Sequence, residues 1–200
     1  MQIKKTIVLV GLIIIIIIAG AFITLNQRRD SGFSYSENID FEENLGGWVK
    51  DSDVPIDPNN DQPVSWSISR VSSLAKSGDY SLEYYIDGSQ DDGTIWVEKR
   101  IKTEGVSSAE IEVSFDFYSE SESFNVIAKV VSYAGISNPE TEEDFTTLDP
   151  ANQVGGWKNY SHSQKLSVIE NEEVWIGVGI TVAWETEMYY NIDNLRVSIK

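Results

Sequence analysis

The sequence predicts an all-β fold, most simply an antiparallel β-sandwich of the jelly-roll type, preceded by one N-terminal membrane-spanning helix. Every second residue is apolar in 111–117 and again in 174–182. Such alternation is typical of strands with one face in a core. No long stretch after Leu25 keeps a period of 3.6 residues, so crossover helices are not expected. Turn-forming residues separate the apolar runs at 51–63, 87–93 and 135–150.

The remaining strands are predicted from shorter alternating runs. We expect them at 64–70, 81–86, 94–101, 124–133, 160–168 and 189–199. Together with the two longer runs they make eight strands, which suffices for a sandwich or jelly roll. Residues 38–200 are therefore assigned to a single domain, and residues 26–37 to a short polar tether.

The N-terminal segment is predicted to be a signal anchor. Residues 6–25 carry no charge and include six consecutive isoleucines. At about 1.5 Å per residue this segment reaches roughly 30 Å, the thickness of the hydrocarbon core of a bilayer. We expect residues 1–5 to be a cytoplasmic stub and the domain to be extracellular, in a single-pass cell-membrane protein. The alternative is a signal peptide cleaved after residue 21, which would make the protein secreted.

Composition narrows the classes of partner and of chemistry. Residues 31–200 hold 11 basic and 31 acidic side chains, so the domain repels phosphate and nucleic acid is not expected as a partner. The chain has no cysteine, which excludes disulfides and thiolate metal sites. Its one histidine, His162, lies in a polar run and is interpreted as an exposed or edge residue. The sequence does not predict an oligomeric state.

Two segments near the ends of the domain each combine a carboxylate with large apolar neighbours. Glu42 follows Phe41, and Asp193 follows Ile192. This pattern predicts that the first and last strands meet, with both carboxylates at the junction. The two groups could hold a cation there, or they could accept hydrogen bonds from neighbouring backbone N–H groups.

Four short motifs follow one another along the domain: Phe41-Glu42, Gly47-Trp48, the run 76–82, and the run 192–195. In order and spacing they resemble the calcium-containing jelly-roll carbohydrate-binding modules attached to xylanases and cellulases, within the galactose-binding-like group. The resemblance implies a structural calcium ion bound by the carboxylates of Glu42 and Asp193. It also implies that backbone carbonyls complete the site, near Asp40, Lys76 and Asp79. Calcium takes six to eight oxygen ligands, so this mixture of donors is chemically reasonable.

Aromatic side chains outside the expected core are candidates for sugar contact, because flat rings pack against pyranose C–H faces. Strand parity places Trp96 with Arg100 on the side opposite the apolar residues of 94–101, and it places Trp175 beside Gly177 and Gly179, where small residues would leave a trough. The same alternation on other strands adds further residues to the candidates for sugar contact. The predicted ligand-binding set is Trp96, Trp175, Tyr85, Tyr118, Asp116 and Arg100.

The function predicted from these features is a membrane-anchored, extracellular, non-catalytic module that binds a glycan or a glycosylated component of the cell surface. The first alternative is a structural or adhesive envelope protein that uses its aromatic residues for protein contacts. The second is a glycoside hydrolase, for which Glu185 and Glu187 are the only suitable carboxylate pair near a strand end. That pair lacks the third acid usual in β-sandwich hydrolases.

Overall fold

A computed structural model describes residues 33–88, 90, 92–120, 122–152, 155–167, 169 and 172–200. The predicted membrane span at 6–25 lies outside these residues. Among the residues described, no helix is both long and apolar enough to cross a membrane.

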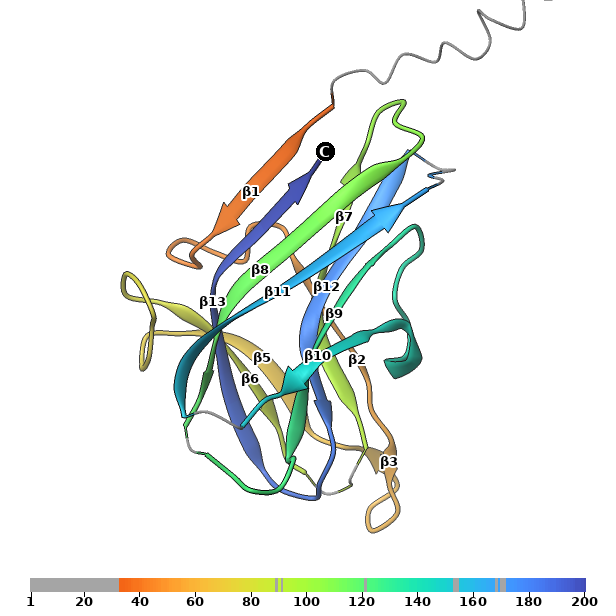
Figure 1. Cartoon of the computed structure of the whole chain (residues 1–200). Coiled ribbons are helices and arrows are strands. Elements are labelled where there is room, and N and C mark those ends of the chain that lie inside the picture. The colour runs from red at the N-terminus through yellow and green to blue at the C-terminus, as the bar shows by residue number, and fades with distance from the viewer. Residues whose placement is uncertain are drawn as a thin grey trace, which may run out of the picture. The chain divides into compact units, whose positions relative to one another are not determined.

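The described residues form two antiparallel sheets (Figure 1). In the six-stranded sheet, β1 (Tyr35–Ile39) pairs with β13 beside a row of five strands. That row runs in the order β11 (Gly156–Leu166), β8 (Ala109–Ser119), β13 (Met188–Ile199), β6 (Ser81–Ile86) and β5 (Trp66–Val71). The five-stranded sheet has the order β10 (Thr146–Pro150), β9 (Ala128–Gly135), β12 (Glu173–Val182), β7 (Thr94–Lys102) and β2 (Val49–Asp53).

Consecutive strands alternate between the sheets from β7 to β9 and again from β11 to β13, the kind of crossing that a jelly roll requires. Two short strands, β3 (Ile56–Asp57) and β4 (Gln62–Pro63), form a separate hairpin. Within the described ranges, the single helical turn is the 3-10 turn at Glu142–Asp144. The prediction of an all-β sandwich is therefore confirmed.

The core lies between the two sheets and is built from the alternating residues that the sequence identified. In β8, residues 111, 113, 115 and 117 are buried, whereas 112 is exposed and 114, 116 and 118 are only partly covered. In β12 nearly every residue is buried, because the outer face of this strand is covered as well. Apolar burial of this extent is the main favourable term for folding.

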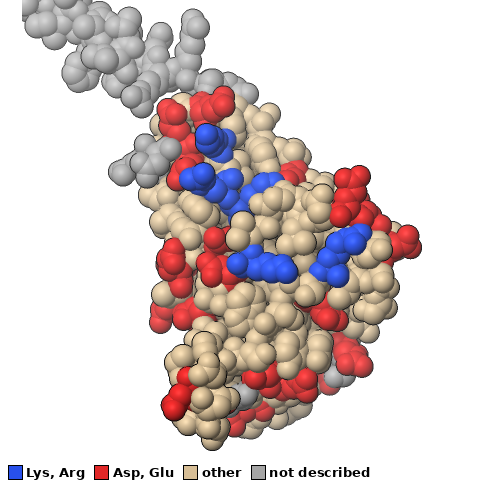
Figure 2. Space-filling view, turned by 180° about the vertical axis from the view of Figure 1, so that it is seen from behind, with Lys and Arg blue, Asp and Glu red and all other residues tan. Residues whose placement is uncertain are grey.

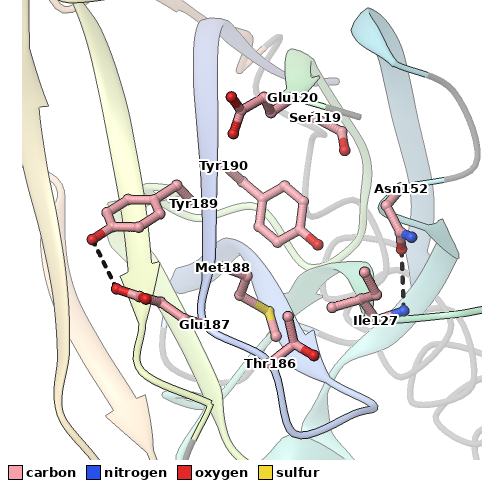
Figure 3. Close-up of a pocket in the computed structure, with 9 residues that line it drawn as sticks. All are labelled: Ser119, Glu120, Ile127, Asn152, Thr186, Glu187, Met188, Tyr189 and Tyr190. Atoms are coloured by element: carbon pink, nitrogen blue, oxygen red, sulfur yellow. Dashed lines mark hydrogen bonds between the residues drawn. The ribbon is translucent and has the colours of Figure 1, made fainter. Parts of the chain in front are cut away.

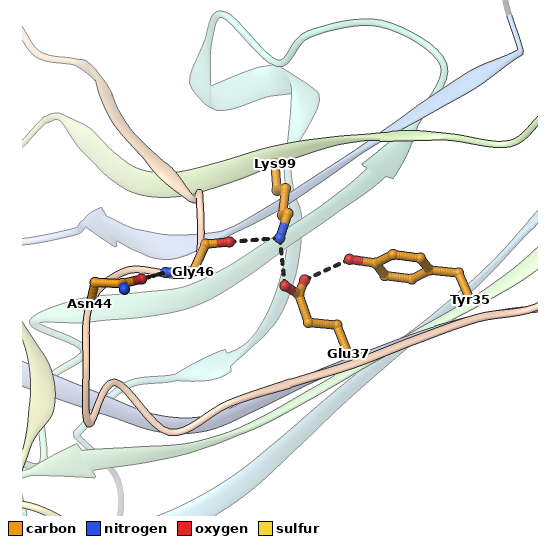
Figure 4. A network of polar contacts seen from close by, with 5 residues as sticks. All are labelled: Tyr35, Glu37, Asn44, Gly46 and Lys99. Atoms are coloured by element: carbon orange, nitrogen blue, oxygen red, sulfur yellow. Dashed lines mark hydrogen bonds and ion pairs between the residues drawn. The ribbon is translucent and has the colours of Figure 1, made fainter.

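The first and last strands are neighbours, as predicted: β1 pairs with β13 from Tyr35↔Ile199 to Ile39↔Leu195. A polar network ties this end of the six-stranded sheet to the other sheet (Figure 4). Lys99 of β7 donates to Glu37 of β1 and, at 2.7 Å, to the carbonyl of Gly46. Glu37 also accepts the Tyr35 hydroxyl at 2.8 Å. Both charges of this ion pair are largely shielded from solvent. Removal of either side chain would therefore leave the other charge without a partner, which is destabilising.

Three element predictions differ from the structure. β1 starts at Tyr35, inside the segment assigned to the tether. β10 lies within the predicted turn stretch 135–150, and β2 (Val49–Asp53) extends into the predicted turn stretch 51–63. Both are edge strands with mostly polar sequences, so neither carries an apolar alternation that a sequence pattern could reveal.

Candidate functional site

Glu42 and Asp193 both hold one turn, residues 76–80, against the sheet. Asp193 is fully buried in β13, and its Oδ2 accepts the two backbone N–H groups of 76–77, each at 2.9 Å. Glu42 follows β1, and its Oε1 accepts those of 79–80, also at 2.9 Å. Burial raises the pKa of the Asp193 carboxyl, while its N–H donors act in the opposite direction. The two carboxylates therefore anchor the turn at both of its ends.

An arginine lies at the same junction. Arg70 of β5 donates through Nε to the carbonyl of Phe41 at 2.5 Å and through Nη2 to the carbonyl of Glu42. Its guanidinium carbon lies 3.2 Å from the centroid of the Tyr80 ring. A positive charge thus already faces the backbone oxygens that follow β1, in a contact that combines hydrogen bonds with a cation–π interaction.

The two carboxylates predicted to bind calcium accept hydrogen bonds from neighbouring backbone N–H groups. The N–H groups of Lys76 and Asp79 donate to these carboxylates, and the side chain of Asp40 accepts the N–H of Glu42 at 3.2 Å. No group of three or more His, Asp or Glu side chains that could hold a metal occurs in the described ranges. Two carboxylates and backbone carbonyls are oxygen donors that suit calcium, so calcium at Glu42 and Asp193 stays a prediction.

The prediction that Trp96 lies at the surface is wrong. Trp96 does point away from the core, yet none of its surface is exposed. Phe145 covers it from the segment after the 3-10 turn, with ring centroids 5.0 Å apart. The predicted trough is filled in the same way, because a Cβ on Gly177 would meet the Phe145 ring at 2.9 Å and one on Gly179 would meet Trp96 Cβ at 2.7 Å. Gly177 makes room for the Phe145 ring and Gly179 for the close approach of β7 at Ile95 and Trp96, so neither leaves space for a ligand.

Trp175 and Arg100 form a small surface cluster on the same sheet. They are paired in register across β12 and β7, and the guanidinium carbon lies 5.9 Å from the Trp175 ring centroid. Arg100 also faces Glu173 at 3.7 Å. Figure 2, which shows the molecule from behind, has Lys and Arg side chains across the middle and acidic side chains around them. No pocket accompanies Trp175 and Arg100 among those described below.

The buried carboxylate of Glu98 lies beneath this surface, on the same strand as Trp96 and Arg100. Glu98 is 5% exposed, and its Oε2 accepts the Trp96 indole N–H at 2.7 Å. Burial is the largest cause that raises the pKa of Glu98 above its ordinary 4.5, and Asp51 and Glu140 raise it further, whereas the bonds from Trp96 and Asn138 lower it. The folded domain therefore binds this proton more tightly than the unfolded chain does.

In the window from the ordinary carboxyl pKa up to the raised one, the stability contributed by Glu98 must fall as pH rises. We expect Glu98→Gln, which keeps an acceptor for Trp96, to be more stable than the parent at pH 7, with a smaller gain at pH 5. Urea unfolding at both pH values measures this difference. Since the lowered pKa of His162 affects both proteins alike, it cancels. An equal gain at both pH values would show that charge at Glu98 is not the cause.

The outer face of the six-stranded sheet brings together aromatic residues from four strands. Tyr118 of β8 is opposite Trp157 of β11, with ring centroids 5.3 Å apart. Tyr85 of β6 is opposite Tyr189 of β13, with centroids 4.8 Å apart. Asn191 lies between these pairs, because it is opposite Tyr118 on one side and Glu83 on the other. At about 4.8 Å between strands, the row from Trp157 to Glu83 spans roughly 14 Å.

A pocket of about 300 Å³, here called the face pocket, opens on this row. Asn191 is 5% exposed, and its Nδ2 donates to Ser81 Oγ at 3.0 Å, which fixes its orientation. The Ser81 hydroxyl in turn donates to the carbonyl of Leu74 at 2.6 Å. The residues lining the face pocket include Leu74, Glu83, Tyr118, Glu120, Tyr189 and Asn191. The turn held by Glu42 and Asp193 thus continues directly into one wall of the face pocket.

A second pocket, here called the end pocket, has a volume of about 150 Å³ and lies where β13 begins (Figure 3). Ile127 and Met188 give it apolar surface, and Tyr190 points across it from β13 toward Asn152. Glu120 and Tyr189 line both pockets, so the two are adjoining.

The predicted ligand residues are therefore divided between the sheets. Tyr85 and Tyr118 share the outer face of the six-stranded sheet, whereas Trp175 and Arg100 lie on the other sheet. Asp116 is on the same face as Tyr118, but its carboxylate accepts the side-chain amides of Asn159 and Asn194 at 3.2 and 3.0 Å. The sequence interpretation missed Trp157, Tyr189, Glu83 and Asn191. Parity within 189–199 could have found Tyr189 and Asn191, while only the strand order places them beside Tyr85 and Tyr118.

The hydrolase alternative gains no geometric support. Glu187 accepts the Tyr189 hydroxyl at 3.2 Å and lines the end pocket, whereas Glu185 is exposed and lines neither pocket. The two predicted carboxylates therefore do not converge on one of these pockets.

Comparison with known proteins finds no matching protein-family model and no matching curated protein. Solved structures do match. A family 11 carbohydrate-binding module of Clostridium thermocellum, in complex with a mixed-linked tetrasaccharide, is 14% identical with a TM-score of 0.47, over 81% of this chain and 94% of that one. The CBM22-1 xylan-binding domain of a Paenibacillus barcinonensis protein is also 14% identical with a TM-score of 0.47, over 82% and 91%.

A third match is to carbohydrate-binding modules of the β-sandwich superfamily, at 17% identity and a TM-score of 0.45. There the alignment covers 78% of this chain and 59% of the other. The tetrasaccharide and the xylan belong to those proteins, and the site in this chain rests on its own residues.

Proposed function

We propose that this domain is a non-catalytic glycan-binding module whose ligand occupies the face pocket. The observation that carries the proposal is the pair of aromatic clusters, Tyr118 with Trp157 and Tyr85 with Tyr189, on either side of the buried amide of Asn191. Aromatic rings offer apolar area to sugar C–H faces, and a few fixed polar groups set the orientation of the ligand.

The polar groups of the face pocket suit hydroxyl recognition. Asn191 is held by Ser81, so its amide loses little conformational freedom when a ligand binds. Glu83 is opposite it on β6 and can accept hydroxyl protons. A site that hydrogen-bonds ligand hydroxyls also rejects analogues that lack them, because its own polar groups would then be left without partners.

Alanine substitution of the aromatic residues tests this proposal. We expect Tyr118→Ala and Trp157→Ala each to weaken binding of the ligand identified on a glycan array by about tenfold, or about 1.4 kcal/mol. Trp175→Ala is the matched control on the other sheet and should bind normally, as measured by isothermal titration calorimetry. Loss of binding with Trp175→Ala alone would move the site to the five-stranded sheet, and the absence of any bound glycan would contradict the proposal.

Residues 6–25 supply the rest of the proposal, a single-pass membrane anchor with the domain outside the cell. The expected result is that protease added to intact cells removes the domain, while a cytoplasmic marker protein stays whole. Secretion after cleavage would instead place the domain in the medium, and protection from protease in intact cells would contradict the outside location.

Exposed apolar side chains support the second candidate function, an adhesive envelope protein. Trp184 is 57% exposed, and Phe124 is fully exposed. Exposed aromatic residues often mark protein interfaces. If this function is correct, the change Trp184→Ala should abolish binding of a partner protein, while the variants Tyr118→Ala and Trp157→Ala keep that binding.

A further inference from the structure

The face pocket and the end pocket adjoin at Glu120 and Tyr189, which line both of them, and the two pockets together are here called the Glu120–Tyr189 groove. Tyr189 is 48% exposed and stands at the boundary between the pockets. A ligand longer than a single ring can therefore contact both pockets without leaving the surface.

All the charged side chains that line this groove are acidic. Glu83 lines the face pocket, Glu187 lines the end pocket, and Glu120 lines both, whereas no Lys or Arg is among the lining residues. The phenol of Tyr189 is consistent with this, because its pKa is raised by burial first and by Glu187 next. Negative potential of this kind repels uronates and sulfated sugars and attracts cations.

The hydroxyl of a largely buried tyrosine provides the second, independent observation. Tyr190 is 3% exposed and lines the end pocket, and in the described part of the chain its hydroxyl makes no hydrogen bond (Figure 3). Because this hydroxyl faces the pocket and has no partner among the described residues, it is free to donate a hydrogen bond to a ligand or to accept one. Ile127 and Met188 beside it match the apolar face of a sugar ring.

We infer that the Glu120–Tyr189 groove is selective for glycans built from amino sugars with free, protonated amines. The inference rests on the proposed glycan-binding function and names the class of glycan. Tyr189 supplies the ring contact, the three carboxylates receive the ammonium groups, and the Tyr190 hydroxyl bonds a ring substituent. A lysine-rich peptide shares the positive charge but has no pyranose face to place on the aromatic rings.

Four probes, each of four units, test the inference by isothermal titration calorimetry at pH 6. They are a β-1,4-linked glucosamine tetramer, its fully N-acetylated counterpart, cellotetraose and tetralysine. We expect the glucosamine tetramer to bind at least tenfold more tightly than the N-acetylated one in 50 mM NaCl, and the gap to shrink in 0.5 M NaCl through screening. Tetralysine should bind at least tenfold more weakly than the glucosamine tetramer.

Substitutions assign the preference to the groove. The double change Glu83→Gln with Glu187→Gln should remove most of the preference for free amines, while the exposed Glu143→Gln should leave it intact. Tyr190→Phe should weaken the binding of the glucosamine tetramer and of its N-acetylated counterpart several-fold. The melting temperature of this variant should change little. Unfolding melts of each variant show whether lost binding reflects a lost fold.

The outcomes separate the inference from the proposed function. Equal binding of the free-amine and N-acetylated tetramers, or preference for a neutral glycan, overturns the inference and leaves the proposed function standing. Tetralysine binding as tightly as the glucosamine tetramer also overturns it, because charge alone would then explain the affinity. Failure of every glycan, on the array and here, overturns both.

Discussion

Replacing Trp96 with alanine is expected to lower the free energy of unfolding by about 4 kcal/mol and the melting temperature by about 10 °C. The indole is completely buried between Phe145 and the glycines of β12, so its removal leaves a cavity that packed backbone cannot fill. The change also removes the N–H donor of the buried Glu98. Urea unfolding at pH 7 measures the effect.

The affinity for glycan should not change in folded Trp96→Ala, because Trp96 lies on the sheet opposite the face pocket. Trp96→Phe is the matched variant: it keeps a ring against Phe145 but lacks the indole N–H, so its cost should be smaller. A stable Trp96→Ala protein that no longer binds glycan would return Trp96 to the ligand site and contradict this account of the five-stranded sheet.

Asp193→Ala is expected to lower both stability, by about 2 kcal/mol, and glycan affinity. The carboxylate holds the backbone of 76–77 and also accepts the N–H of Asn194 at 2.7 Å. Without it, three donors lose their acceptor, and the turn that continues into the wall of the face pocket is released at one end. Unfolding in urea and titration with the same glycan measure the two effects.

Asp193→Asn is the control for this change, since it keeps the side-chain volume and one acceptor oxygen while removing the charge. We expect it to fall between the parent and the alanine variant. The same melts test calcium: if calcium binds at Asp193, calcium raises and EDTA lowers the melting temperature of the parent but not that of Asp193→Ala. If neither reagent changes the melting temperature of the parent, hydrogen bonds alone hold the turn at Asp193, and the calcium prediction is contradicted. Unchanged stability and affinity in Asp193→Ala would show that the carboxylate does not hold the turn.

Central strands could be predicted from the sequence, and edge strands could not. Residues 111–117 and 174–182 alternate because one face of each strand is buried against the opposite sheet, and that burial leaves its record in residue type. The edge strands β2 and β10 bury little apolar surface of their own, so partners in β7 and β9 define them and composition does not.

The candidate site shows the same division. Parity assigned Tyr85 and Tyr118 to the outside of their strands, and the structure places both beside the face pocket or its aromatic pairs. Parity also assigned Trp96 to the outside of its strand, yet the segment bearing Phe145 folds over that outer face and buries it. Parity reports which side of a strand a residue is on, but it does not report what covers that side.

The sequence by itself determined the fold class, the meeting of the first and last strands, and the position of Glu42 and Asp193 at that junction. These features depend on local alternation and on carboxylates beside apolar anchors. The tertiary structure alone decided what the carboxylates bind and which aromatic residues share a face. Both depend on strand order and register, which bring β6, β8, β11 and β13 together from distant parts of the chain, and on the turn and loop segments that cover the sheets.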